Sequence, residues 1–209
     1  MDTNKITYQE IIREFERPSN RPLLCFDVVG SWKGGAHYTR KELLSLVDNA
    51  TNPSLKIGLW LLAFLGLSLV EIQNLKVRDF RLARGFISLS GRFVPFRIVD
   101  SLPSDLRYRL ESARGEDKLI LKSSRSSIYA ELLRISKLTG VGYTPIKLQE
   151  NFINWHLLRG VDPYYLAFSV GVSYERVSQF IPDIVNQSFY NDVQRDNIRL
   201  LQKHLNICE

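Results

Sequence analysis

The stretch from residue 144 to residue 172 reads TPIKLQENFINWHLLRGVDPYYLAFSVGV and predicts two proline-started helices in succession. Proline suits the first turn of a helix because its missing N–H would have no partner there. Pro145 therefore predicts the start of one helix, and Pro163 predicts the start of a second. Gly171 then predicts the turn that ends the second helix.

The remaining sequence predicts a mainly helical chain with a small antiparallel β-meander, which is an α+β fold class. Helices are expected at residues 3–17, 39–49, 55–65, 71–75, 104–111, 127–137, 173–180 and 192–207. Strands are expected at residues 22–29, 86–89, 93–99 and 119–121, with Ser90, Gly91 and Arg92 forming a hairpin turn.

The composition favours one compact domain with small appendages. The chain has 209 residues, 44% of them hydrophobic and 24% charged. Its 28 Lys and Arg residues outnumber 22 Asp and Glu residues, which gives a net charge of +6. Such an excess favours a polyanionic partner, because lysines and arginines that neutralise phosphates release condensed counterions. We divide the chain into an N-terminal appendage (1–38), a central domain (39–182) and a C-terminal tail (183–209).

Several classes of protein are disfavoured by the sequence. Cys25 and Cys208 lie at opposite ends of the chain, without a Cys-x-x-Cys motif or a Cys/His cluster. We therefore expect no metal site, no disulfide framework and no cofactor. The longest apolar run, at residues 57–70, is too short to span a membrane. No signal segment opens the sequence, so we expect a soluble, cytoplasmic protein.

The segment 144–172 resembles, without a gap, the T-P-H-x-L-R-H-x-F … R-G-V-D … L-G-H motif of tyrosine recombinases of the phage-integrase type. The matching residues are Thr144, Pro145, Leu148, Phe152, Arg159, Gly160, Val161, Asp162 and Gly171. Earlier in the chain, Gly66, Leu67, Glu71, Leu75 and Asp79 match T-G-L-R-x-S-E-L … L … D-(I/F), and Val94, Pro95 and Phe96 are similar to V-P-L. The resemblance covers roughly residues 39–182 and implies the catalytic-domain fold of that family.

The catalytic groups of the family are absent at the matching positions. The resemblance implies that Ser68 and Gln149 replace two arginines, that Ile146, Glu150 and Val172 replace histidines, and that Phe180 replaces the nucleophilic tyrosine. Arg92 is the basic residue nearest to the position of the family's hairpin lysine. Loss of one comparable transition-state donor costs roughly 10²–10³-fold in rate. We therefore predict a catalytically inactive relative, with no guanidinium or hydroxyl group from elsewhere in the chain beside Ser68 and Gln149.

The resemblance also implies binding of double-stranded DNA, since the same face of the family wraps a duplex. Contacts to the DNA backbone position a protein without reading the base sequence. The expected DNA-binding residues are Lys76, Arg78, Arg81, Arg84, Arg92, Arg97, Lys122, Arg125, Lys147, Arg159 and Arg176. The family's separate N-terminal clamp domain is expected to be missing or reduced to residues 1–38. The predicted role is architectural, regulatory or in segregation, with the protein associated with the nucleoid.

Two alternatives remain open. The tail could join protomers in a homo-oligomer, or assemble with or inhibit an active recombinase, through an amphipathic helix with Ile198, Leu201, Leu205 and Ile207 on one side. The chain could also be a site-specific recombinase with a displaced nucleophile. Tyr190 is the main candidate, and Tyr164, Tyr165 and Tyr174 are the others. His156 is expected to be packed or on the surface and to have no catalytic role.

Overall fold

The computed structural model describes residues 7, 9–11, 13, 38–95, 103–112, 115, 117–158 and 161–180. These residues form helices and one small antiparallel sheet, which confirms the predicted fold class. The helices are α3 (Arg40–Asp48), α4 (Pro53–Leu65), α5 (Leu69–Asn74), α6 (Ser104–Ser112), α7 (Arg125–Thr139), α8 (Pro145–Leu158), α9 (Pro163–Val170) and α10 (Tyr174–Ser178). None of them is long and apolar enough to cross a membrane.

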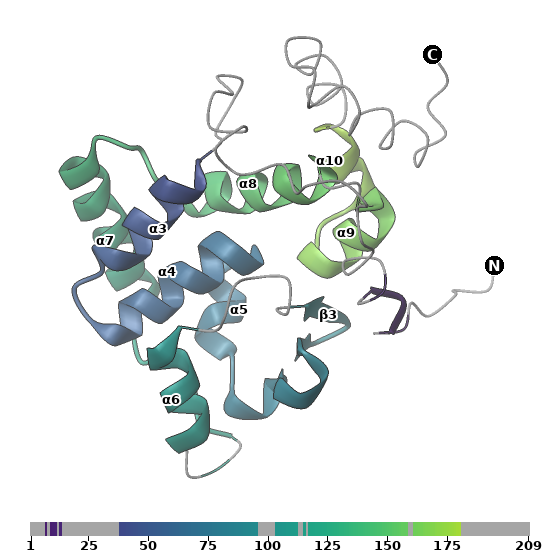
Figure 1. The fold of residues 1–209 in the computed structure, drawn as a ribbon, viewed down its shortest axis with the longest axis horizontal. Coiled ribbons are helices and arrows are strands. Elements are labelled where there is room, and N and C mark those ends of the chain that lie inside the picture. The colour runs from purple at the N-terminus through teal and green to yellow at the C-terminus, as the bar shows by residue number, and fades with distance from the viewer. Residues whose placement is uncertain are drawn as a thin grey trace.

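Helix α4 is central to the described part of the chain, and Figure 1 shows α3, α5, α7 and α8 arranged around it. Its sequence is apolar on nearly every side, as expected for a helix buried all round. The side chain of Asn52 caps its start, and Gly66 ends it with a positive φ of 60°. A Cβ atom on Gly66 would lie 2.7 Å from Cδ1 of Phe152, so α8 packs directly onto the end of α4.

The three strands are ordered β1 (Phe80–Arg81), β2 (Phe86–Leu89) and β3 (Arg92–Pro95), each antiparallel to its neighbour. Leu89 lies opposite Arg92, so the turn consists of Ser90 and Gly91 alone. The prediction that Arg92 belongs to the turn is therefore wrong. Because side chains alternate along a strand, Arg92 lies on the same face as the fully buried Val94.

Other boundaries also differ from the predictions. Residues 119–121 do not form a named strand, because only one isolated bridge joins Lys76 to Leu119. Helices α5 and α7 start two residues earlier than predicted, since Ser68 and Ser124 cap them. Of the predicted first helix, residues 9–11 and 13 are described as helical, and the buried Ile11 joins an apolar cluster formed with α8 and α9. The predicted segments 22–29, 96–99 and 192–207 lie outside the described residues.

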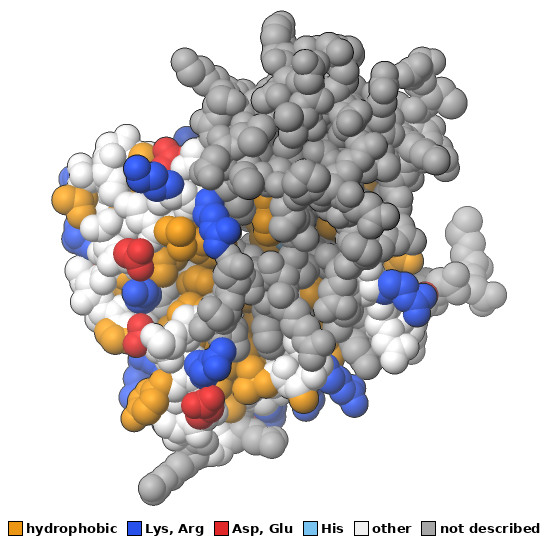
Figure 2. Space-filling model, viewed as in Figure 1, with side chains coloured by type: hydrophobic (Ala, Val, Ile, Leu, Met, Phe, Trp, Pro, Cys, Tyr) orange, Lys and Arg blue, Asp and Glu red, His pale blue; other side chains and the backbone are white. Residues whose placement is uncertain are grey.

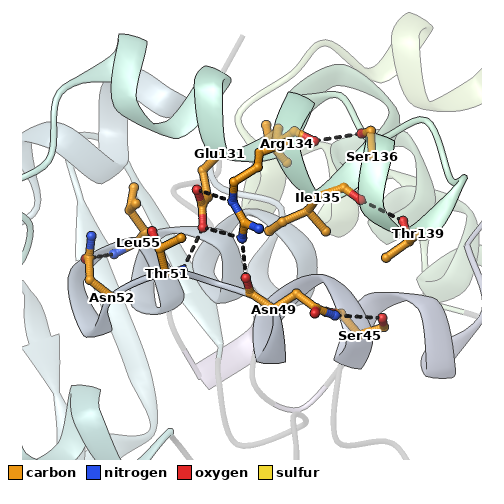
Figure 3. A network of polar contacts seen from close by, with 11 residues as sticks. Ser45, Asn49, Thr51, Asn52, Leu55, Glu131, Arg134, Ile135, Ser136 and Thr139 are labelled. Atoms are coloured by element: carbon orange, nitrogen blue, oxygen red, sulfur yellow. Dashed lines mark hydrogen bonds and ion pairs between the residues drawn. The ribbon is translucent and has the colours of Figure 1, made fainter.

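A buried carboxylate fastens the turn between α3 and α4 to α7 (Figure 3). The side chain of Glu131, only 6% exposed, accepts a hydrogen bond from the backbone N–H of Thr51 at 2.6 Å. It also accepts from Nε and Nη2 of Arg134 at 3.0 and 2.9 Å, and Nη2 donates to the carbonyl of Asn49 as well. The hydrogen bond from Arg134 lowers the pKa of the Glu131 carboxyl group.

We predict that Glu131→Gln lowers the free energy of unfolding by about 1–3 kcal/mol near neutral pH, because an NH2 donor replaces one of the two accepting oxygens and the charge that pairs with Arg134 is lost. Because the pKa of Glu131 is lowered by folding, the carboxylate stabilises the fold at pH values above its ordinary pKa of 4.5. This stabilisation is lost as the pH falls through the pKa of the folded state. The difference between wild type and variant should therefore shrink below that pH. Urea denaturation across a pH series measures it, with the exposed Glu111→Gln as the control. A difference independent of pH would contradict the prediction.

Candidate functional site

Three of the positions where the family carries catalytic groups lie in one surface hollow between α5, α7 and α8. This α5–α7–α8 hollow has a volume of about 240 Å³ and is lined by Leu67, Ser68, Leu69, Val70, Arg125, Tyr129, Pro145, Ile146 and Gln149. The structure thus brings Ser68, Ile146 and Gln149 together. Val172 and Phe180 lie elsewhere, partly buried against the apolar cluster of α8 and α9.

The polar side chains at two of these positions bind the protein itself. The hydroxyl of Ser68 donates to Oε2 of Glu71 at 2.8 Å and accepts from the backbone N–H of Glu71, which forms the capping box of α5. Nε2 of Gln149 donates to the carbonyl oxygen of Gly66 at 3.1 Å. These two residues therefore contribute to the packing of α4, α5 and α8.

Two side chains of α7 also reach the hollow. Arg125 and Tyr129 line it beside Ser68 and Gln149. The expectation that no guanidinium or hydroxyl group from elsewhere in the chain would lie there is wrong. Nε of Arg125 donates to Oε1 of Gln73 at 2.9 Å, which fixes the guanidinium over the end of α5. The four-residue spacing along α7 indicates that Arg125 and Tyr129 share one face of that helix, but it does not indicate that this face lies beside α8.

Arg92, which was expected to contact DNA, is buried instead. Only 6% of its side chain is exposed, and Nε donates to Oε1 of Glu71 at 2.9 Å, with Nη2 donating to the same oxygen. The turn after α9 covers the guanidinium, since a Cβ atom on Gly171 would lie 2.8 Å from Nε. The C-terminal end of a helix dipole favours a cation at this place. In this structure Arg92 therefore joins α5, β3 and α9, and its guanidinium lies inside the protein.

A second carboxylate pairs with the arginine of α10. Nη2 of Arg176 donates to Oε1 of Glu150, and Nη1 donates to Gln179 at 3.3 Å. The guanidinium carbon lies 5.3 Å from the ring centre of Phe180, a cation–π contact at the position of the family's tyrosine. Glu150 therefore partly neutralises a residue that was predicted to bind phosphate.

The remaining predicted DNA-binding residues fall into three groups. Lys76 and Arg78 share one partner, Asp117, at 3.2 and 2.5 Å. The exposed residues are Arg81, Arg84, Lys122, Arg125 and Lys147. Arg97 and Arg159 lie outside the described residues. In the view of Figure 2, basic side chains are scattered among hydrophobic and acidic ones over the described part of the surface.

One basic residue was missed by the sequence analysis. Lys118 lies with Lys122 at a second hollow of about 420 Å³, which Gln73, Ser123 and Ser124 also line. Because Gln73 binds Arg125, this hollow neighbours the α5–α7–α8 hollow. We call the exposed residues Lys118, Lys122, Arg125 and Lys147 the basic strip. The isolated β-bridge between Lys76 and Leu119 places Lys118 at this hollow, and no sequence motif predicts that bridge.

The histidine and tyrosine predictions have mixed outcomes. His156 is buried between the rings of Phe152 and Trp155, with centroids 4.3 and 4.6 Å away, and this confirms the prediction of a packed histidine. Tyr164 and Tyr174 are exposed, whereas Tyr190 lies outside the described residues. Within the described residues, no group of three or more His, Cys, Asp or Glu side chains could hold a metal ion.

Comparisons with known proteins were made at the level of sequence and of structure. No family model matches the sequence, and no curated protein matches it either. Solved structures do match, among them a crystal structure of XerA recombinase. The TM-score is 0.56 at 20% sequence identity, over 77% of this chain and 59% of that chain. The chain therefore has a recombinase-like fold and spans less than two thirds of the length of that recombinase.

We predict that Glu71→Gln lowers the free energy of unfolding by about 3–5 kcal/mol, because it leaves the buried charge of Arg92 without a counter-ion. Replacing both partners, as Glu71→Gln with Arg92→Met, should recover part of this loss, since no buried charge then remains. The exposed Arg81→Ala should change stability by less than about 0.5 kcal/mol. Chemical denaturation tests all three. Equal stability of wild type and Glu71→Gln would show that the pair does not support the fold.

Proposed function

Starting from the recombinase-like fold, we propose that this chain binds double-stranded DNA without cleaving it, in an architectural, regulatory or segregation role. One observation carries the proposal. The positions of the family's phosphate-binding groups lie in a mainly apolar hollow, and two arginines close to other replaced groups, Arg92 and Arg176, are paired with carboxylates. Basic residues remain exposed beside that hollow.

The absence of catalysis follows from the electrostatics of phosphoryl transfer. A phosphorane with developing negative charge needs preorganised cationic donors within hydrogen-bond distance. Gln149 is neutral and bonded to Gly66, while Ile146 is inert. Arg125 is the sole guanidinium that lines the hollow among the described residues, and no imidazole lines it there. One guanidinium in a mainly apolar hollow does not replace two arginine phosphate clamps and three histidines.

Duplex binding is supported by the basic strip. Lys118 and Lys122 line the second hollow, Arg125 lines the α5–α7–α8 hollow, and Lys147 follows Ile146 of that hollow along α8; no acidic residue lines either hollow. The strip includes the N-terminus of α7, where Ser124 caps a helix of 15 residues. Free N–H groups and the helix dipole favour a phosphate at such an end. Backbone contacts of this kind position a duplex without selecting its sequence.

The salt dependence of duplex binding tests this proposal. Each phosphate contact contributes a slope of about −0.9 in log K against log salt concentration. We predict that Lys122→Ala, Arg125→Ala and Lys147→Ala each flatten the slope by about one unit. Lys137→Ala, exposed at the far end of α7, is the matched control and should leave the slope unchanged. Absence of a mobility shift with random duplex at low salt would refute duplex binding.

Incubation with nicked suicide duplexes tests the lack of cleavage. We predict no covalent protein–DNA adduct on denaturing gels, because the described residues show no complete set of phosphate-binding donors. Tyr129 lines the hollow beside Arg125, so both Tyr129 and Tyr190 are tested as possible nucleophiles. An adduct that disappears in Tyr129→Phe or Tyr190→Phe would instead establish a recombinase with a displaced nucleophile.

A further inference from the structure

The α5–α7–α8 hollow is edged by large hydrophobic side chains that lie open to solvent. Val70 of α5, Tyr129 of α7 and Ile146 of α8 are 48%, 53% and 67% exposed. Leu133, also exposed, follows Tyr129 by one helical turn and so extends the same stripe of α7. Contiguous exposed hydrophobic groups of this kind mark interaction sites on soluble proteins.

The size of the hollow limits what it can hold. Its volume of about 240 Å³ lies below the roughly 300–1,000 Å³ of most small-molecule pockets. The buried side chains of Leu67 and Leu69 form an apolar base. A single aliphatic or aromatic side chain fits such a space, and its burial would also cover Ile146. The hollow is therefore suited to one anchoring side chain of a larger partner.

The charge around the hollow defines the partner further. No acidic residue lines it, and Arg125 has both Nη nitrogens left for a carboxylate, because only its Nε is bonded to Gln73. Lys147 follows Ile146 and is exposed. The first turns of α7 and α8, helices of 15 and 14 residues, also form part of the wall and add partial positive charge. An acidic partner is the electrostatic complement of this surface.

We propose that the α5–α7–α8 hollow is a docking site for an acidic protein segment that inserts one aliphatic or aromatic side chain and places a neighbouring carboxylate on Arg125. A duplex alone is a poor occupant, because Val70 and Ile146 would face a charged phosphate backbone. This inference goes beyond DNA binding and does not depend on it. Since Arg125 belongs to the basic strip as well, an acidic segment and a duplex should compete for it.

Fluorescence anisotropy with the full chain and short labelled peptides tests the proposal. The peptides carry one Leu, Ile, Phe or Trp between glutamates. Two control sets replace the central residue by serine or the glutamates by lysines. We expect micromolar to millimolar binding of at least one acidic peptide with an apolar centre, as for transient docking. Ile146→Ser and Arg125→Glu should each weaken it at least about tenfold, whereas Leu138→Ser and Lys137→Glu, exposed at the far end of α7, should not.

Specific outcomes would overturn the proposal. Failure of every acidic peptide to bind at its solubility limit would do so, as would equal binding of the lysine or serine controls. Unchanged affinity in Ile146→Ser would place the peptide elsewhere on the protein. An oligothymidylate serves as the last probe: if it binds in a manner that depends on Ile146, the hollow accepts an unpaired nucleic-acid strand instead of a protein segment. Circular dichroism of each variant confirms that the surface substitutions leave the fold intact.

Discussion

The buried ion pair between Arg92 and Glu71 is the interaction on which the arrangement of the site depends. A single carboxylate holds the hairpin through Arg92 and caps α5 through Ser68. The guanidinium lies under the turn at Gly171, so the same pair packs against the C-terminal end of α9. A buried charge is costly without its partner, which makes the two residues interdependent. In this fold, a cation placed between hairpin, α5 and α9 has become part of the protein's interior.

Under the function that we propose, this internal pairing explains how a recombinase-like fold can be kept with a different surface chemistry. Two arginines near the replaced positions, Arg92 and Arg176, face carboxylates of the chain itself. The α5–α7–α8 hollow is lined mainly by hydrophobic side chains, and Gln149, one of its polar residues, binds the end of α4. Among the exposed cations, Arg125 and Lys147 lie in the first turns of α7 and α8, and Lys122 shortly precedes α7. This distribution supports the proposed contacts with a DNA backbone or an acidic segment.

Much of the fold could be predicted from local signals, whereas much of the site could not. Pro145 and Pro163 predicted the starts of α8 and α9, and the apolar run of α4 predicted its burial, because each depends on nearby residues. Arg92 was predicted wrongly because the hairpin turn was taken to be one residue too long. Side chains alternate between the two faces of a strand, so Arg92 lies on the same buried face as Val94. Arg125 and Lys118 reach the site only through tertiary contacts, with Gln73 and through the bridge at Lys76, which no spacing in the sequence encodes.

Nuclear magnetic resonance of the arginine Nε–H groups tests the central claim most directly. The account requires that Arg92 is held by Glu71 inside the protein, and that Arg125 remains at the surface. Its prediction is that the Nε–H signal of Arg92 exchanges slowly with solvent and stays unchanged when duplex DNA is added, while the signal of Arg125 shifts. Fast exchange of the Arg92 signal, together with a shift on adding DNA, would show that Arg92 binds phosphate and would contradict the account.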